Sequence, residues 1–213
     1  MRRVLMVSPH FPPDSSAAAH RVRLLAPHLP AAGWCPTVVT VETNGYEGRL
    51  DTELASLVPD SIEVVRAPTW PAKWTRRVGI GDLGLRAFVG LRRACRGLLA
   101  RERFDALFIT VYPVYPALLG PRLKSEFGVP FILDYQDPWV GEWGRRVGGG
   151  SNGTPDFKSR ASRQLGEWLE PRAVQAADAL VAVSQGTLDG IVRRIPVAPG
   201  VPTDVIPLGF EPS

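Results

Sequence analysis

Short apolar runs alternate with longer stretches of helical periodicity along most of the chain. Most of these runs are continuously apolar, without the polar–apolar alternation of a strand that has one solvent-exposed face, so they indicate strands covered on both faces. Seven runs are predicted to be strands: Val4–Val7, Thr37–Val41, Ile62–Arg66, Ala106–Thr110, Phe131–Tyr135, Ala179–Val183 and Asp204–Ile206. The five stretches predicted to be helices are Ala19–Ala32, Leu83–Arg103, Pro116–Phe127, Ser159–Ala176 and Gln185–Arg194.

This alternation of strands and helices predicts the fold class. Strand–helix–strand units give a parallel sheet with helices on both faces. We therefore expect an α/β fold, a three-layer Rossmann-like domain with a mostly parallel sheet of about seven strands. The length of 213 residues suits one such domain, and no linker divides residues 1–213.

The fold class also indicates where to look for a site, because ligands of such sheets bind at the carboxyl ends of the strands. The loops predicted at that edge are Ser8–Ala18, Thr110–Tyr115, Gln136–Lys158 and Ser184–Gly186. The third loop contains the glycine-rich tract Gly148–Gly153, which suits either a lid over the site or a disordered surface loop.

The composition favours a cytoplasmic protein. Hydrophobic residues make up 45% of the chain, but no run reaches the length of a membrane span. The apolar run near the N-terminus is too short for the core of a signal peptide. The two cysteines, Cys35 and Cys95, form neither a disulfide framework nor a paired metal spacing.

Basic residues are concentrated in one segment. The net charge is +4, but residues 69–103 contain nine positive and two negative residues, a net +7, which leaves −3 for the rest of the chain. The nine are Lys73, Arg76, Arg77, Arg86, Arg92, Arg93, Arg96, Arg101 and Arg103. Such a cluster predicts a partner of opposite charge. We expect no nucleic acid, because no nucleic-acid-reading motif accompanies the charge.

Aromatic residues accompany part of this cluster. Trp70, Trp74, Arg76 and Arg77 precede the predicted helix Leu83–Arg103. Indoles and cations together suit a membrane interface, where the rings lie at headgroup depth and the cations meet anionic lipids. Peripheral binding to the inner face of an anionic membrane is therefore predicted through these four residues. The alternative is that the arginines form a solvated face, while the helix packs on the sheet through an apolar stripe.

The loop after the first strand ends in small residues where a helix is predicted to begin. Ser15, Ser16 and Ala17 stand at this point. A helix start carries unpaired N–H groups, and small side chains would let a phosphate reach them. The alternative is that a serine caps the helix. His10 and Arg21 would either add positive charge to the site or lie at the surface.

Two carboxylates mark the end of the fifth predicted strand. Asp134 lies at the strand end and Asp137 just beyond it. A buried carboxylate is costly unless it is bonded or functional, and Asp134 is expected to bond backbone N–H groups of the loop. Trp139 follows at the mouth of the loop, where a sugar could stack on the indole. The spacing is not that of a metal-chelating Asp-x-Asp pair, so no metal is expected.

Sequence motifs of several other α/β enzyme classes are absent. No Gly-x-Gly-x-x-Gly follows the first strand, which argues against a nicotinamide dehydrogenase. There is also no P-loop and no Gly-x-Ser-x-Gly nucleophile elbow.

Four segments, spread over nearly the whole chain, resemble family 4 glycosyltransferases in the family's order. The first combines Pro12-Pro13 and the small residues after it with a helix that ends in Gly-Trp and with a Val-rich second strand. The second, Asp134–Trp139, is similar to an Asp-x-Arg-Asp-x-Trp strand end. The third, Ala176–Ser184, is similar to Ala-Asp-x-Val-Val-x-Val-Ser, and the fourth, Val205–Phe210, to Val-Ile-Pro-Asn-Gly-Phe.

The resemblance implies the N-terminal, acceptor-side domain of a two-domain GT-B glycosyltransferase. The C-terminal domain, absent from residues 1–213, would bind a nucleotide-sugar as co-substrate, and transfer would retain the anomeric configuration without a metal or other cofactor. The acceptor would be a glycan, a lipid-linked molecule or a small molecule. Two alternatives stay open: a non-catalytic α/β domain that binds an anionic ligand or partner, and half of a GT-B-type sugar-nucleotide epimerase.

The resemblance also implies roles for residues at the strand ends. The substrate-binding candidates are Ser15, Ser16, Ala17, Arg21, Tyr112, Asp134 and Trp139, and the catalytic candidate, which would orient or activate the acceptor hydroxyl, is Asp137. Three positions depart from the family. Ser16-Ala17 replaces the usual Gly-Gly, Gln136 replaces an arginine, and Thr110–Pro113 replaces an element that contains a histidine.

Overall fold

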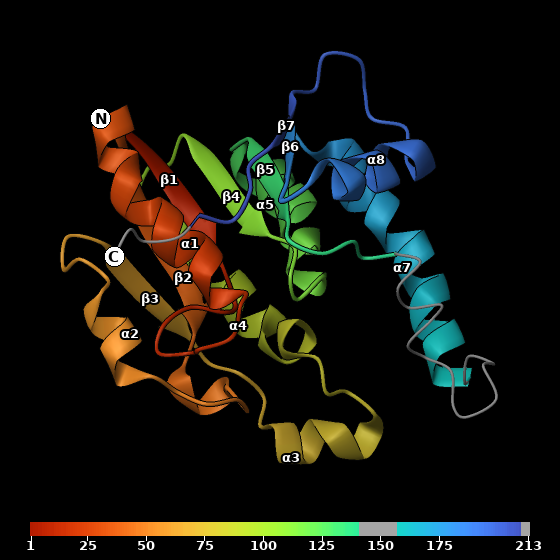
Figure 1. Ribbon diagram of the computed structural model, residues 1–213, viewed down its shortest axis with the longest axis horizontal. Helices are drawn as coiled ribbons and strands as arrows, with labels where there is room; N and C mark the ends of the chain where they lie inside the picture. The colour runs from red at the N-terminus through yellow and green to blue at the C-terminus, as the bar shows by residue number, and fades with distance from the viewer. Residues whose placement is uncertain (141–156, 210–213) are drawn as a thin grey trace.

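The computed structural model describes residues 1–140 and 157–209 (Figure 1). The glycine-rich tract Gly148–Gly153, considered above as a lid or a surface loop, lies outside this part of the chain. Within the described residues, strands and helices follow each other in the predicted order.

The described residues contain seven strands, which are all parallel and form one sheet of order β3-β2-β1-β4-β5-β6-β7. The strands are β1 (Arg2–Val7), β2 (Trp34–Val41), β3 (Glu63–Ala67), β4 (Ala106–Thr110), β5 (Phe131–Tyr135), β6 (Ala179–Ala182) and β7 (Thr203–Val205). The predicted fold class is confirmed. From β1, the strands β2 and β3 follow toward one edge of the sheet, and β4 to β7 follow toward the other edge. The direction of the strand order therefore reverses between β1 and β4, which makes this position the topological switch point.

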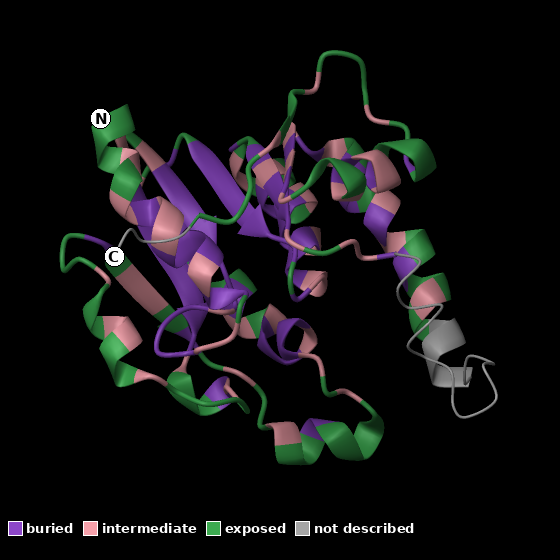
Figure 2. Cartoon of the chain, viewed as in Figure 1, coloured by how far each residue is buried: buried purple, intermediate pink, exposed green. Residues whose placement is uncertain are grey.

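Helices cover both faces of this sheet. On one face lie α1 (Ala19–Leu25) and the 3₁₀ helix η1 (Ala26–Ala32), in a cluster with apolar residues of β1, β2 and β4. The other face is covered by α4 (Leu83–Leu99), α5 (Leu119–Phe127), α7 (Phe157–Ala176) and α8 (Gln185–Arg194). Figure 2 shows the buried strands between these layers. The short helices are η2 (Thr43–Gly45), α2 (Thr52–Ser56), α3 (Ala72–Thr75), η3 (Arg76–Val78) and η4 (Tyr115–Leu118).

The first predicted helix is divided in two. The α-helical part ends at Leu25, and residues 26–32 form a 3₁₀ helix. Pro27 and Pro30 have no N–H to donate, so an α-helical hydrogen-bond ladder cannot continue through them. Gly33 then ends the helix with φ of 81°, a left-handed conformation that glycine adopts without steric cost.

Arg86, counted above among the basic cluster, is buried. Only 3% of the residue is exposed. Its Nη2 donates to the carbonyl of Gly45 at 2.9 Å, and its Nη1 donates to the carbonyl of Trp70 at 3.1 Å. The guanidinium therefore joins two loops inside the domain, and the basic surface is smaller than the sequence indicates.

Candidate active site at the carboxyl ends of the strands

The loop after β1 lies at the switch point and is fixed by side chains from neighbouring elements. The hydroxyl of Tyr46 lies 3.1 Å from the carbonyl oxygens of both Pro9 and Phe11. Nη2 of Arg66 donates to the carbonyl of Pro12 at 2.7 Å. These contacts hold the backbone that carries the polar groups described next.

His10, Asp14 and Ser16 form a hydrogen-bonded cluster in this loop. Nδ1 of His10 lies 2.5 Å from Oδ2 of Asp14, and Oγ of Ser16 donates to the same oxygen at 2.7 Å. Burial alone would raise the pKa of Asp14, but hydrogen bonds from His10 and Ser16 outweigh burial, so the pKa is lowered and the carboxylate is ionised at neutral pH. An ionised Asp14 favours the tautomer of His10 that carries its proton on Nδ1. Nδ1 is thus engaged within the loop, and Nε2 is the ring nitrogen that faces other partners.

Two tyrosines enclose the His10 ring. The ring stacks on Tyr46 with centroids 6.2 Å apart and on Tyr112 with centroids 5.8 Å apart. Tyr112 is 43% exposed, so the stack reaches the surface. Among the side chains of residues 1–140 and 162–209, none is hydrogen-bonded to Nε2 of His10. This nitrogen can therefore contact a ligand that binds against Tyr112.

A second carboxylate, Asp82, faces the cluster from the start of α4. Its Oδ1 caps the helix by accepting the N–H of Leu85 at 2.8 Å. Burial raises the pKa of Asp82, against the lowering by backbone N–H groups and by the nearby His10. The sequence analysis did not select Asp82, although an aspartate directly before a helix is a typical N-cap signal.

The small residues before α1 offer backbone groups to a ligand, because the serine side chains are already bonded. Oγ of Ser15 donates to the carbonyl of Arg49 at 2.8 Å, and Ser16 belongs to the His10 cluster. The N-cap is Ala18 and has no side-chain hydrogen bond, so neither serine caps the helix. In the part of the chain that the structure describes, the N–H groups of Ala17 and Ala18 have no acceptor. Ala17 is exposed, whereas Ala18 is only 4% exposed.

Arg21 and Asp134 are buried against each other. Arg21 is 4% exposed and Asp134 is 0% exposed. Nε of Arg21 lies 2.9 Å from Oδ2 of Asp134, and Nη2 lies 2.5 Å from Oδ1. Nη1 donates to the carbonyls of Ile206 at 2.7 Å and Pro207 at 3.1 Å. The pair therefore joins α1, the end of β5 and the segment after β7.

This ion pair corrects two expectations. The prediction that Asp134 bonds backbone N–H groups is wrong, because its carboxylate oxygens accept from the guanidinium of Arg21. The alternative that Arg21 is a surface residue is wrong as well. Burial raises the pKa of Asp134, and the hydrogen bonds and charge of Arg21 oppose that shift.

Asp137 and Trp139 lie beyond β5, and no hydrogen bond among the described residues joins them to the His10 cluster. Asp137 is exposed, and partial burial raises its pKa. The Trp139 ring contacts Tyr115 edge-on with centroids 5.6 Å apart, and its indole lies beside Gly166 of α7. Nε2 of Gln136, which stands where the family has an arginine, is buried without a hydrogen-bond partner among the described residues. The sequence analysis considered His10 only as added positive charge or as a surface residue, whereas the structure places it in a hydrogen-bonded cluster with Asp14 and Ser16.

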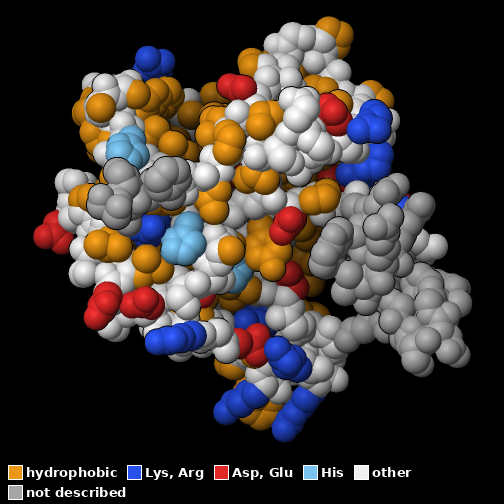
Figure 3. Space-filling view, viewed as in Figure 1, with side chains coloured by type: hydrophobic (Ala, Val, Ile, Leu, Met, Phe, Trp, Pro, Cys, Tyr) orange, Lys and Arg blue, Asp and Glu red, His pale blue; other side chains and the backbone are white. Residues whose placement is uncertain are grey.

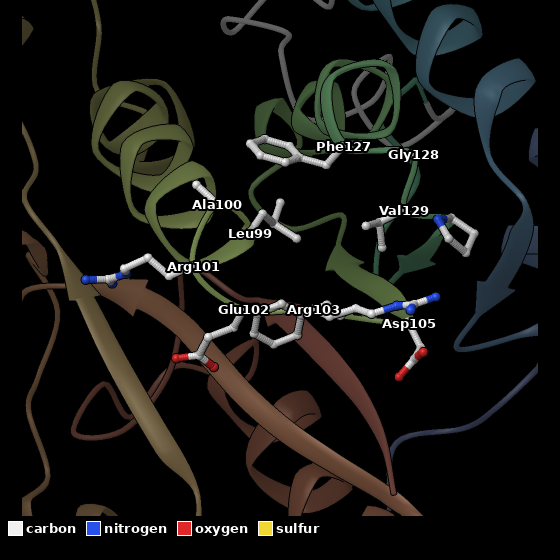
Figure 4. Close-up of a pocket in the computed structure, with 11 residues that line it drawn as sticks. Leu99, Ala100, Arg101, Glu102, Arg103, Asp105, Phe127, Gly128 and Val129 are labelled. Atoms are coloured by element: carbon white, nitrogen blue, oxygen red, sulfur yellow. The ribbon is translucent and has the colours of Figure 1, made fainter.

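Two hollows lie at the opposite, amino-terminal edge of the sheet. One of about 530 Å³ lies between the ends of α4 and α5 and is lined by 99–105 and 127–130 (Figure 4). The other, of about 470 Å³, is lined by residues that include Lys124 and 175–178. Neither is lined by a predicted site residue. We place the site at the carboxyl edge, because ligands of doubly wound sheets bind there and the His10 cluster lies there.

The strand order defines the class: this is a doubly wound Rossmann-like domain, and domains of this class bind ligands at the carboxyl ends of their strands. The family model described as "Glycosyl transferase 4-like domain" matches residues 16–209, and the chain belongs to this family. The resemblance to family 4 glycosyltransferases is confirmed, and the chain is a glycosyltransferase domain.

A curated relative matches part of the chain. The alpha-maltose-1-phosphate synthase of Mycolicibacterium smegmatis is 33% identical over 87 residues, which cover 38% of this chain and 19% of that protein. The chain therefore aligns with about a fifth of the length of this relative.

Solved glycosyltransferase structures share the fold. Sucrose-phosphate synthase from Thermosynechococcus elongatus aligns with a TM-score of 0.66 at 16% identity, over 99% of this chain and 49% of that chain. UGT2 from Phytolacca americana aligns with a TM-score of 0.56 at 12% identity, over 99% and 52% of the two chains. HepE from Anabaena, solved in complex with UDP-glucose, aligns with a TM-score of 0.56 at 14% identity, over 99% and 45%. The chain thus spans about half of these proteins.

Proposed function

We propose that these residues form the acceptor-side domain of a glycosyltransferase whose nucleotide-sugar donor is held mainly by a second domain. The observation that carries the proposal is the His10 cluster at the switch point, where the loops after β1 and β4 meet beside Tyr112. Membership of the glycosyl transferase 4-like family supports it over a non-catalytic domain or an epimerase half. The coverage of about half of the sucrose-phosphate synthase chain supports a second domain.

The residues of the carboxyl edge take distinct roles in this proposal. The acceptor lies against Tyr112, and its hydroxyl is oriented by His10, with Asp137 as the second candidate for this role. Ala17 faces the diphosphate of the donor, and Arg21 with Asp134 holds the surrounding elements in place. The acceptor oxygen bonds to the anomeric carbon of the donor, the acceptor proton is released, and the nucleoside diphosphate leaves. The proposal keeps the expectations of retention and of no metal, which come from the family resemblance.

The location of the protein belongs to the proposal too. No helix in the described ranges 1–140 and 157–209 is long and apolar enough to cross a bilayer. A cytoplasmic protein that binds the inner face of a membrane remains the predicted location.

Binding of UDP to the loop before α1 is the first test. UDP is expected to shift the amide NMR signals of Ala17 and Ala18, whose N–H groups have no acceptor among the described residues. Ala17→Leu is expected to weaken this binding about tenfold by placing bulk over the N–H groups, which corresponds to roughly 1.4 kcal/mol. Because Ala17 is exposed, the melting temperature should stay unchanged.

Ala31→Leu is the matched control, because Ala31 is an exposed alanine of η1. It should leave the response to UDP as it is in the wild type. Shifts confined to the amino-terminal edge, or equal UDP affinity of both leucine variants, would contradict a donor-facing loop.

Donor turnover is the second test. Since the donor is held mainly by another domain in our proposal, the 213-residue chain should release no nucleoside diphosphate from UDP-, ADP- or GDP-sugars. Release would be measured with a coupled diphosphate assay, and sugar epimerisation by NMR of the same samples. Efficient turnover would rule out the two-domain arrangement, and interconversion of the sugar without release would favour the epimerase.

A further inference from the structure

The segment between β3 and α4 carries an exposed aromatic surface. Trp70 is 53% exposed, Trp74 is 56% exposed and Val78 is 74% exposed. The indole patch, as we name this surface, consists of Trp70, Lys73, Trp74, Arg76, Arg77 and Val78. It is formed by α3, η3 and the residues that lead into them.

Hydrogen bonds to Arg86 of α4 fix the backbone of the indole patch at Trp70. The N–H of Trp70 donates to the carbonyl of Arg86 at 3.1 Å, and Nη1 of Arg86 donates back to the carbonyl of Trp70 at 3.1 Å. The adjoining helix α3 buries Thr75, which is 7% exposed, and leaves Trp74 in contact with solvent. A short helix that faced only water would bury its indole and expose its hydroxyl. The reversed arrangement indicates a partner less polar than water.

Positive charge surrounds the exposed rings. Lys73 and Arg77 lie against the Trp74 ring, at 5.7 Å and 4.9 Å from its centroid. Arg76 pairs with Glu47 at 3.0 Å, whereas no carboxylate of the described residues pairs with Lys73 or Arg77. Figure 3 shows basic side chains gathered around hydrophobic atoms at the end of the molecule where Figure 1 places α3. The patch thus combines apolar rings with uncompensated cations.

The indole patch adjoins the candidate active site. Asp82, which begins α4 shortly after the patch, is close enough to His10 for their charges to interact. Two residues further on, Gly84 packs so tightly on the loop after β4 that a Cβ there would lie 2.7 Å from Cδ of Pro116. The start of α4 therefore bridges the patch and the groups that face the acceptor.

We propose that the indole patch docks the protein on an anionic lipid bilayer, and that the acceptor is a lipid-anchored molecule whose hydroxyl reaches His10 from that bilayer. The identity of the acceptor rests on the proposed function, whereas the docking does not. The indoles lie at headgroup depth, and Lys73, Arg76 and Arg77 contact lipid phosphates. A lipid-anchored acceptor diffuses in the plane of the membrane, so docking brings it to the site without release into solution.

Cosedimentation with vesicles tests the docking. The 213-residue chain is expected to bind phosphatidylcholine vesicles more tightly as the fraction of phosphatidylglycerol rises, and more weakly as salt is added. The charge-reversed variant Arg76→Glu/Arg77→Glu and the variant Trp70→Ala/Trp74→Ala are each expected to lose about tenfold or more in affinity. Because these four side chains are exposed, both variants should fold as the wild type does.

Matched controls lie elsewhere on the molecule. Arg101→Glu/Arg103→Glu makes the same charge change at the amino-terminal edge, and Trp168→Ala removes an indole that is 60% exposed on α7. Both should bind vesicles as the wild type does. Binding that ignores the lipid charge, or that falls equally in the controls, would overturn the proposal. Binding of RNA or of a protein through the same arginines, without vesicle binding, would overturn it too.

The orientation on the bilayer tests the acceptor. Lipids with a spin label at the headgroup should broaden the amide signals of residues 70–78 and of Tyr112, and leave those of residues 101–105 sharp. Broadening at 70–78 alone would overturn the lipid-anchored acceptor and leave the docking intact. Vesicle binding without the response of Ala17 to UDP would instead contradict the proposed function, so the two failures are distinguishable.

Discussion

Replacing Arg21 with methionine is expected to lower the free energy of unfolding by about 3–5 kcal/mol. The substitution keeps the apolar stem and removes the guanidinium, which leaves the carboxylate of Asp134 at 0% exposure without its counter-charge. It also removes the donor to the carbonyls of Ile206 and Pro207. Urea unfolding followed by circular dichroism would measure the loss.

The loss of stability in the Arg21→Met variant should increase as the pH rises from mildly acidic to neutral. Burial already raises the pKa of Asp134 above its ordinary value of 3.8, and loss of Arg21 removes the interactions that oppose this shift. A carboxyl whose folded pKa exceeds its unfolded pKa loses stability as pH rises through the interval between the two. The Arg21→Met variant should therefore be less destabilised at mildly acidic pH than at neutral pH.

Two controls identify the buried charge as the cause. The double variant Arg21→Met/Asp134→Leu removes both charges and should recover much of the lost stability. Arg3→Met breaks a half-exposed pair with Glu102 and should cost no more than about 1 kcal/mol. If the double variant were less stable than Arg21→Met, the buried carboxylate would not be the source of the destabilisation.

The second large effect is expected at Gly90 in α4. A Cβ at this position would lie 2.1 Å from the carbonyl oxygen of Pro68, a backbone atom that cannot rotate away. Gly90→Ala should therefore push α4 from the segment after β3, at a cost of about 1–3 kcal/mol for overpacking. The gain in helix propensity from the same change, up to about 1 kcal/mol, offsets only part of that cost.

Gly97 in the same helix supplies the matched control. Nothing lies within 4 Å of a Cβ added there, so Gly97→Ala should stabilise the protein by about 0.5–1 kcal/mol through helix propensity alone. Thermal unfolding of the two variants should give melting temperatures on opposite sides of the wild type. If Gly90→Ala raised the melting temperature as Gly97→Ala does, the carbonyl of Pro68 would lie farther from Gly90 than the structure shows.

The strands were predictable because burial on both faces removes polar residues from them. All five residues of β4 are buried, and its predicted bounds, Ala106–Thr110, are those observed. The short helices α2 and α3 were not predicted, because four or five residues complete too little of a periodic pattern to be seen. At the C-terminal end of α4 the pattern was extended too far, to Arg103 instead of Leu99.

The candidate site was predictable in position but only partly in detail. The fold class places it at the strand ends, where the His10 cluster lies. The pairing of Arg21 with Asp134 joins residues 113 positions apart, which spacing within one sequence cannot reveal. The contact between His10 and Asp14 is local, but both residues lie in an irregular loop where no helical or strand periodicity predicts which side chains meet. The roles of Asp137, Trp139 and the phosphate loop stay predictions.

Because Arg21 contacts the segment after β7, its surroundings can be completed only late in the synthesis of this domain. Strands β2 to β7 each add next to a strand that has already left the ribosome, so the sheet can grow as the chain emerges. Arg21 emerges early, but Asp134 follows 113 residues later and the carbonyl of Pro207 follows 186 residues later. A nascent chain therefore carries Arg21 without its partner Asp134 until 113 further residues have been synthesised. The carboxyl edge, where the candidate site lies, is the last region of the domain to mature.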